Sequence, residues 1–164
     1  MLFTGEYEHT IDTKQRLAIP ADIRGQLEAE QHGEILYLAP GANGALWLWP
    51  EHVFERMTSA AEGTLLPGDE VMQFDELMFP YTRRLEIDKN GRVRIPQDML
   101  GEFGLDQTVI ILGMRDHLEL REPQQWKRQR QDNLAKRREI MQRARESLKS
   151  GSITTNGGGQ KDHP

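Results

Sequence analysis

The chain has 164 residues, no cysteine and a formal net charge of −5. The lack of cysteine excludes disulfide bonds, thiol catalysis and zinc sites built on cysteine. Apolar runs are four or five residues long, whereas a membrane-spanning helix needs about 20, and residues 1–6 lack the features of a signal peptide. We therefore expect a soluble intracellular protein without a membrane partner.

The first predicted element is a strand, because apolar and polar residues alternate from Phe3 to Asp12. The chain then turns within three residues, resumes as a strand at Arg16 and stops at Pro20, which can open a short helix. Two short apolar runs follow and complete a unit that we place at residues 5–54.

Residues 87–96 repeat residues 11–20. Both windows read Ile-Asp-x-x-x-Arg-x-x-Ile-Pro, and the helix and apolar runs recur after the second copy, which predicts a duplicated module. We place the second unit at residues 81–126 and a helical connector at 55–80. Units of about 45–50 residues bury too little surface to be stable alone, so we expect the two units to complete each other.

The charge is distributed unevenly along the chain. Residues 1–120 hold 10 Lys and Arg against 21 Asp and Glu, a balance of −11, whereas residues 121–149 hold 10 against 4, a balance of +6. We expect a basic helix at 127–150 and a disordered glycine-rich tail at 151–164. Two interpretations of the basic helix stay open: a solvated face, or a surface for phosphates or for the acidic surface of a neighbouring subunit.

The repeated motif places an aspartate and an arginine on either side of a short turn, where a hairpin brings them opposite each other. One interpretation is a pair of salt-bridge clamps, which stabilise little when exposed. The other directs the arginines to DNA, because an arginine fork can donate two hydrogen bonds to guanine. The candidate DNA-contacting residues are Asp12, Lys14, Arg16, Arg24, Asp88, Lys89 and Arg92, with Arg83, Arg84 and Arg94 as supporting charges.

The two turns differ in sequence. Asn90-Gly91 in the second is a strong hairpin signal, because both residues tolerate positive φ. The first turn lacks glycine, but we assign it the basic neighbours Lys14 and Arg24. If one copy dominates DNA contact, we expect it to be the first.

Catalytic and cofactor sites have no candidate in the sequence. The five histidines are scattered without metal-ligand spacing, and no serine lies in a nucleophile elbow. The glycine run at 157–159 neither follows a predicted strand nor precedes a helix. We expect a protein that is not an enzyme and that needs no cofactor, metal or small-molecule substrate.

Three stretches of the sequence carry a resemblance to a known family: Phe3-x-Gly5-Glu6-Tyr7, His9-x-Ile11-Asp12-x-Lys14-x-Arg16-Leu17-x-Ile19-Pro20 and Asp88-Lys89-x-Gly91-Arg92-x-x-Ile95-Pro96. They resemble the motifs of the MraZ family of bacterial transcriptional regulators. The resemblance covers about residues 2–126 and implies two SpoVT/AbrB-like domains. The implied fold is α+β with a mainly β core: a swapped-hairpin β-barrel from two tandem repeats with peripheral helices.

The resemblance also implies a function. It suggests a ring-shaped homo-oligomer, an octamer or larger, that binds direct repeats in double-stranded DNA, usually at the promoter of the cell-division and cell-wall gene cluster. The location would be the cytoplasm, on the nucleoid. Gln15 stands where the family usually has glycine, which predicts a stiffer or differently aimed first loop.

Two other functions stay open. A ring-forming scaffold without specific DNA binding would use the repeat for folding and assembly alone. An antitoxin-like protein of the same fold would wrap a toxin with its C-terminal tail, but the tail here is short, rich in glycine and without apolar anchors.

Overall fold

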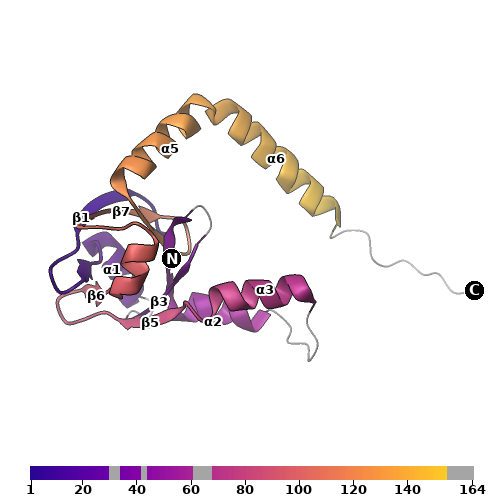
Figure 1. The fold of residues 1–164 in the computed structure, drawn as a ribbon. Helices are drawn as coiled ribbons and strands as arrows, with labels where there is room; N and C mark the ends of the chain where they lie inside the picture. The colour runs from indigo at the N-terminus through magenta and orange to yellow at the C-terminus, as the bar shows by residue number, and fades with distance from the viewer. Residues whose placement is uncertain (30–33, 42–43, 61–67, 155–164) are drawn as a thin grey trace, which may run out of the picture. The chain divides into compact units, whose positions relative to one another are not determined.

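The computed structural model describes residues 1–29, 34–41, 44–60 and 68–154 (Figure 1). The chain divides into two compact units, Met1–Pro123 and Gln124–Pro164. None of the described helices is long and apolar enough to cross a membrane. Of the tail expected to be disordered, residues 155–164 lie outside the described residues.

The two repeats contain the same elements in the same order: two strands, a helix and two strands. The first repeat comprises β1 (Glu6–Thr10), β2 (Arg16–Ala18), α1 (Ala21–Ala29), β3 (Ile35–Pro40) and β4 (Leu46–Pro50). The second comprises β5 (Arg83–Glu86), β6 (Arg92–Arg94), α4 (Gln97–Glu102), β7 (Thr108–Gly113) and β8 (Leu118–Arg121).

Among the described residues, four further helices lie outside this pattern. The helices α2 (Glu51–Ala60) and α3 (Asp69–Met78) follow the first repeat. The basic segment expected to be one helix forms two, α5 (Pro123–Ala135) and α6 (Arg137–Thr154), with a turn at Lys136. Thus α6 runs into the segment 151–164 that the sequence assigns to the tail.

The strands pair across the repeats. A six-stranded sheet has the order β1-β7-β8-β4-β3-β5, and a two-stranded sheet consists of β2 and β6. Every pairing between the described strands is antiparallel, and four of them (β1 with β7, β3 with β5, β4 with β8, β2 with β6) join one repeat to the other. The expectation that the units complete each other is therefore confirmed.

The α+β class expected from the sequence is confirmed as well. The described strands form two antiparallel sheets flanked by helices, and they do not close into a barrel. The swapped-hairpin barrel is thus not confirmed in the described residues, because β1 and β5 are the two edge strands of the six-stranded sheet and do not pair with each other.

The apolar residues of the repeated motif lie at the centre of the core. Leu17 and Val93 face each other across the β2–β6 ribbon, and both are fully buried. Ile19 and Ile95, next to the motif prolines, are buried in the same cluster. The strand alternation that marks the motif in the sequence therefore separates a core face from an outer face.

Two charged side chains of β8 are also buried, Glu119 and Arg121. The Arg121 guanidinium donates to Glu119 Oε2 from Nε at 2.9 Å and from Nη2 at 2.6 Å. Burial acts to raise the pKa of Glu119, but the neighbouring His117, with Nε2 3.8 Å from Glu119 Oε1, and the hydrogen bonds from Arg121 outweigh it and leave that pKa lowered. In this ion pair the two buried charges of β8 compensate each other.

We expect that residues 1–60 and 68–123, expressed separately, do not fold as monomers. Each half loses the partner strands of the four pairings between repeats, so any structure it forms requires a second half and depends on concentration. Circular dichroism of each half, of their mixture and of residues 1–123 across a dilution series measures this. A half that stays folded as a monomer at high dilution would contradict the interleaved fold.

Candidate nucleic-acid interface

Each Asp-x-x-x-Arg loop is closed by the same backbone hydrogen bonds. In the first, the Asp12 N–H donates to the Arg16 carbonyl at 3.0 Å, and the Gln15 N–H to the Asp12 carbonyl at 2.9 Å. In the second, the Asp88 N–H donates to the Arg92 carbonyl and the Gly91 N–H to the Asp88 carbonyl, both at 2.8 Å. The two turns therefore share one local fold.

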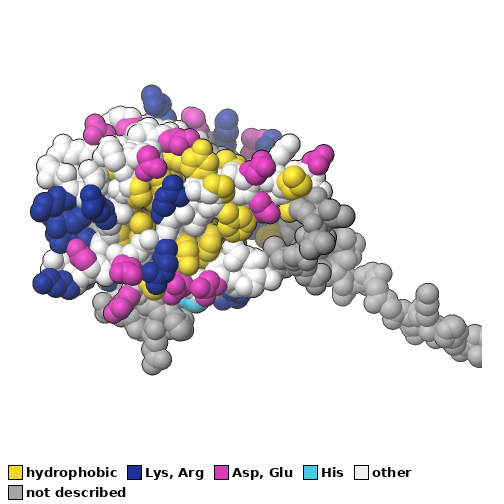
Figure 2. Space-filling view, turned by 60° about the horizontal axis from the view of Figure 1, so that its bottom comes forward, with side chains coloured by type: hydrophobic (Ala, Val, Ile, Leu, Met, Phe, Trp, Pro, Cys, Tyr) yellow, Lys and Arg dark blue, Asp and Glu magenta, His cyan; other side chains and the backbone are white. Residues whose placement is uncertain are grey.

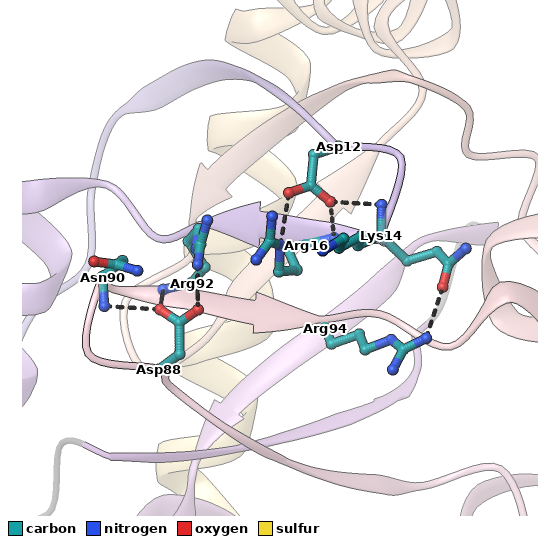
Figure 3. A network of polar contacts seen from close by, with 8 residues as sticks. Asp12, Lys14, Arg16, Asp88, Asn90, Arg92 and Arg94 are labelled. Atoms are coloured by element: carbon teal, nitrogen blue, oxygen red, sulfur yellow. Dashed lines mark hydrogen bonds and ion pairs between the residues drawn. The ribbon is translucent and has the colours of Figure 1, made fainter.

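The first aspartate supports its loop through both carboxylate oxygens (Figure 3). Asp12 Oδ1 accepts from the N–H groups of Lys14 at 2.8 Å and Arg16 at 2.9 Å. Asp12 Oδ2 accepts from Arg16 Nε at 2.7 Å. Within the described residues, the hydrogen bonds of the Arg16 side chain involve only Nε, so its two terminal nitrogens can donate to another molecule.

The second aspartate repeats the arrangement. Asp88 Oδ1 accepts from the N–H groups of Asn90 at 2.8 Å and Arg92 at 3.0 Å. Asp88 Oδ2 accepts from Arg92 Nε at 3.0 Å and forms an ion pair with Nη2 at 2.8 Å. Each carboxylate thus fixes the backbone of its turn and the direction of its arginine.

These contacts lower the pKa of both carboxyl groups. For Asp12 the largest cause is the hydrogen bond from the Arg16 N–H, and for Asp88 it is the hydrogen bond from the Arg92 guanidinium. Both carboxylates therefore stay ionised at pH values below the usual pKa range of aspartate. Because the two ion pairs are partly exposed, we expect a small effect on stability and a larger one on side-chain direction.

The ribbon of β2 and β6 brings arginines of both repeats to one face. Arg16 lies opposite Arg94, and Ala18 lies opposite Arg92. Since alternate residues of a strand point to opposite sides and Leu17 points into the core, these arginines lie on the outer face. Figure 3 shows Arg16, Arg92 and Arg94 along the ribbon. The sequence had placed Arg94 only among the supporting charges.

Each loop tip is tied to the strand of the other repeat. The Ile19 N–H donates to the Gly91 carbonyl and the Ile95 N–H to the Gln15 carbonyl, both at 2.9 Å. Gly91 and Gln15 occupy equivalent positions, directly before the arginine. The two loops are therefore held in a fixed relation by reciprocal hydrogen bonds.

Gln15 adopts the left-handed conformation of Gly91, its counterpart in the second loop. Its φ is +57°, compared with +73° at Gly91, a region that is sterically unfavourable for residues with a Cβ. The backbone hydrogen bonds of the first loop match those of the second, and the stiffer or differently aimed loop expected from Gln15 stays a prediction. The Gln15 Oε1 also accepts from Arg94 Nη2 at 3.4 Å, so this side chain contacts an arginine of the second repeat.

The structure places Arg24 against the second loop. A Cβ built on Gly91 would lie 2.6 Å from both Cδ and Nη1 of Arg24, so only glycine fits there while Arg24 keeps its position. The sequence suggested that Arg24 adds positive charge beside the first loop. Because Arg24 lies beside the second loop instead, it no longer supports the expectation that the first copy makes most of the DNA contacts. Lys14 and Lys89 are exposed in their own loops, as expected.

The other supporting arginines form ion pairs with acidic groups. Arg84 Nε lies 3.5 Å from Glu51 and its Nη1 lies 3.0 Å from Glu86, while Arg83 Nη2 lies 3.8 Å from Asp98. The pKa of Arg84 is raised, first by its hydrogen bond with Glu86. These pairs hold β5 and its neighbours and add little free positive charge.

The fold and the site define a class: an α+β protein of two interleaved repeats with a supported Asp-x-x-x-Arg loop in each. A family model with the description "MraZ protein, putative antitoxin-like" matches residues 2–70 and 78–148. The chain belongs to the MraZ family.

Several curated relatives carry the name transcriptional regulator MraZ. The Mesoplasma florum protein is 31% identical over 140 residues, covering 85% of this chain and 93% of that protein. The proteins of Leuconostoc citreum and Roseiflexus sp. (strain RS-1) are 34% and 33% identical over 125 residues, each covering 76% of this chain and 84% of the relative. The similarity thus spans most of each relative.

We expect Gln15→Gly to raise the free energy of unfolding by about 0.5–1 kcal/mol. Glycine removes a left-handed penalty of about 1–2 kcal/mol, and part of this gain is offset by the greater entropy of the unfolded chain. The reciprocal change, Gly91→Gln, should be destabilising because it adds the same penalty and displaces Arg24. Urea unfolding with equal m-values measures both, and a destabilised Gln15→Gly variant would contradict the argument.

Proposed function

We propose that this protein is a sequence-specific DNA-binding regulator of transcription. The observation that carries the proposal is the outer face of the β2–β6 ribbon. There the Nε of Arg16 donates a hydrogen bond to Asp12, and the Nε of Arg92 donates one to Asp88. The major groove of B-DNA is wide enough for a two-stranded ribbon, and an arginine fork matches the O6 and N7 atoms of guanine. The names of the relatives support the same conclusion.

Within residues 1–120, the charge distribution supports this face over the other surfaces. The body of the chain, residues 1–120, has a balance of −11, which repels phosphates, whereas the ribbon and its two loops concentrate basic side chains. The proposed DNA-contacting set comprises Asp12, Lys14, Arg16, Arg24, Asp88, Lys89 and Arg92 together with Arg94. In this set the lysines contact phosphates, and the supported arginines contact base edges.

We further propose a homo-oligomeric ring, an octamer or larger, on closely spaced direct repeats in the cell-division and cell-wall promoter, with the protein in the cytoplasm on the nucleoid. In this arrangement the interleaved repeats act as one swapped-hairpin unit that presents one ribbon. The support is the family resemblance and the relatives' names. Affinity would come from several ribbons engaging at once, and it would fall steeply with salt.

We expect the double variant Arg16→Ala with Arg92→Ala to raise the Kd for operator DNA at least about 30-fold, because each bidentate contact contributes about 1–3 kcal/mol. Arg56→Ala, which removes an exposed arginine of α2, is the matched control and should bind normally. Gel shifts at fixed salt measure both. Because Arg16 and Arg92 are partly exposed, the double variant should keep its thermal stability. If it binds as tightly as wild type, the assigned site is wrong.

The second expected outcome concerns the target. DNase footprinting on the region upstream of the protein's own gene should show protection at evenly spaced short repeats, and the protection should weaken steeply as salt rises. Arg16→Lys with Arg92→Lys keeps the charge but loses the fork, so it should protect repeats and flanking DNA more equally. An unprotected promoter at moderate salt would favour a scaffold or an antitoxin-like function.

A further inference from the structure

Exposed apolar side chains gather on α3 and the residues after it. Val71, Phe74 and Leu77 of α3 are 52%, 52% and 59% exposed, and α3 buries none of its residues. Figure 2, turned so that the side with β5, α2 and α3 comes forward, shows apolar side chains grouped on this side of the molecule, with both acidic and basic side chains around them. We call Val71, Phe74 and Leu77 the α3 face; such a patch is typical of an interaction surface.

The helix that carries the α3 face is acidic, and Glu70 and Asp75 lie beside the face. The helix contains Asp69, Glu70, Asp75 and Glu76 and no basic residue. Two copies of this face packed on each other would bring like charges together and leave them desolvated, which disfavours a symmetric contact. The surface therefore requires a partner that is apolar in the middle and basic at its edge.

The same chain contains such a partner in α6. Ile140, Met141, Ala144 and Leu148 lie on one side of the helix, because residues three, four and seven apart share a face. Met141 and Leu148 are 65% and 73% exposed. We call this row the α6 stripe.

A basic edge runs beside the α6 stripe. Arg138, Arg145 and Lys149 recur at spacings of seven and four residues, so they line one border of the stripe. Glu139 and Arg143 pair with each other on the opposite side of the helix. At 1.5 Å per residue the stripe from Ile140 to Leu148 spans about 12 Å, and the α3 face spans about 9 Å.

We propose that α6 of one copy docks on the α3 face of a second copy. Apolar burial holds the two helices together, and the basic edge meets the carboxylates of α3 and sets the orientation. The contact joins unlike surfaces, so each copy uses its α3 face for one neighbour and α6 for the other, which generates a ring or a filament. This inference deepens the oligomer of the proposed function and rests on that part of it.

The absence of cysteine from the chain makes cross-linking a direct test. A Phe74→Cys chain mixed with a tagged Met141→Cys chain should form a disulfide-linked heterodimer under mild oxidation, at least tenfold more than matched control pairs. The controls replace Glu76 or Arg143, which lie on the opposite sides of α3 and α6. If Phe74→Cys chains mainly form homodimers, the contact is symmetric. If the disulfide forms efficiently only inside a single chain that carries both Phe74→Cys and Met141→Cys, α6 packs on α3 of its own chain. Either result overturns the proposal.

Charge reversal supplies an independent measurement on the full chain. Glu70→Lys with Asp75→Lys, or Arg138→Glu with Arg145→Glu, should each raise the concentration of half-dissociation at least tenfold in sedimentation experiments. All four changes in one chain should restore assembly, and Arg143→Glu should have no effect. A structural disturbance of α3 or α6 would not be rescued by the combined variant.

The outcomes separate this inference from the DNA-binding proposal. If the wild-type oligomer persists in both reversed variants, the surfaces are wrong while the oligomer and its DNA contact stand. If the wild type is monomeric at all concentrations, the docking and the ring both fail. The gel shift with Arg16 and Arg92 replaced then still tests DNA contact alone.

Discussion

The constraint on which the rest of the structure depends is the pairing of β2 with β6. Leu17 and Val93 meet at its centre without exposure to solvent, and this burial fixes the register that turns Arg16, Arg92 and Arg94 to the other side. A slip by one residue would exchange the two faces, placing arginines in the core and apolar residues in solvent. Core formation and the exposure of the arginines are thus one event.

The sequence predicted the local features around this strand pair but not the contacts between the two repeats. The duplicated motif predicted the turns, the strands and the dependence of each repeat on the other, because alternation and turn residues are local signals. It did not predict that Arg24 of the first repeat lies over Gly91 of the second, or that Gln15 contacts Arg94. These contacts join residues far apart in the chain, and one sequence holds no signal for such distances.

The basic segment illustrates a different limit. Composition predicted a helix and its charge, but the turn at Lys136 falls inside a continuous pattern of good helix formers. The Lys136 N–H donates to the Asp132 carbonyl at the end of α5, and the Lys136 carbonyl accepts from the Ile140 N–H at the start of α6, each at 3.0 Å. A break of one residue between two helices leaves little trace in the residue types.

The reciprocal hydrogen bonds at the loop tips bear on the direction in which a subunit would lie along DNA. Two identical chains that paired in this way would present identical loops and would suit a palindrome. In a single chain the two loops can differ in sequence. Lys14 and Gln15 of the first loop correspond to Asn90 and Gly91 of the second, while the N–H groups of Ile19 and Ile95 fix the position of each loop by hydrogen bonds to the other. Under the proposed function, each ribbon has a distinguishable first and second end. A repeated non-palindromic site can therefore orient every subunit in the same direction along the helix.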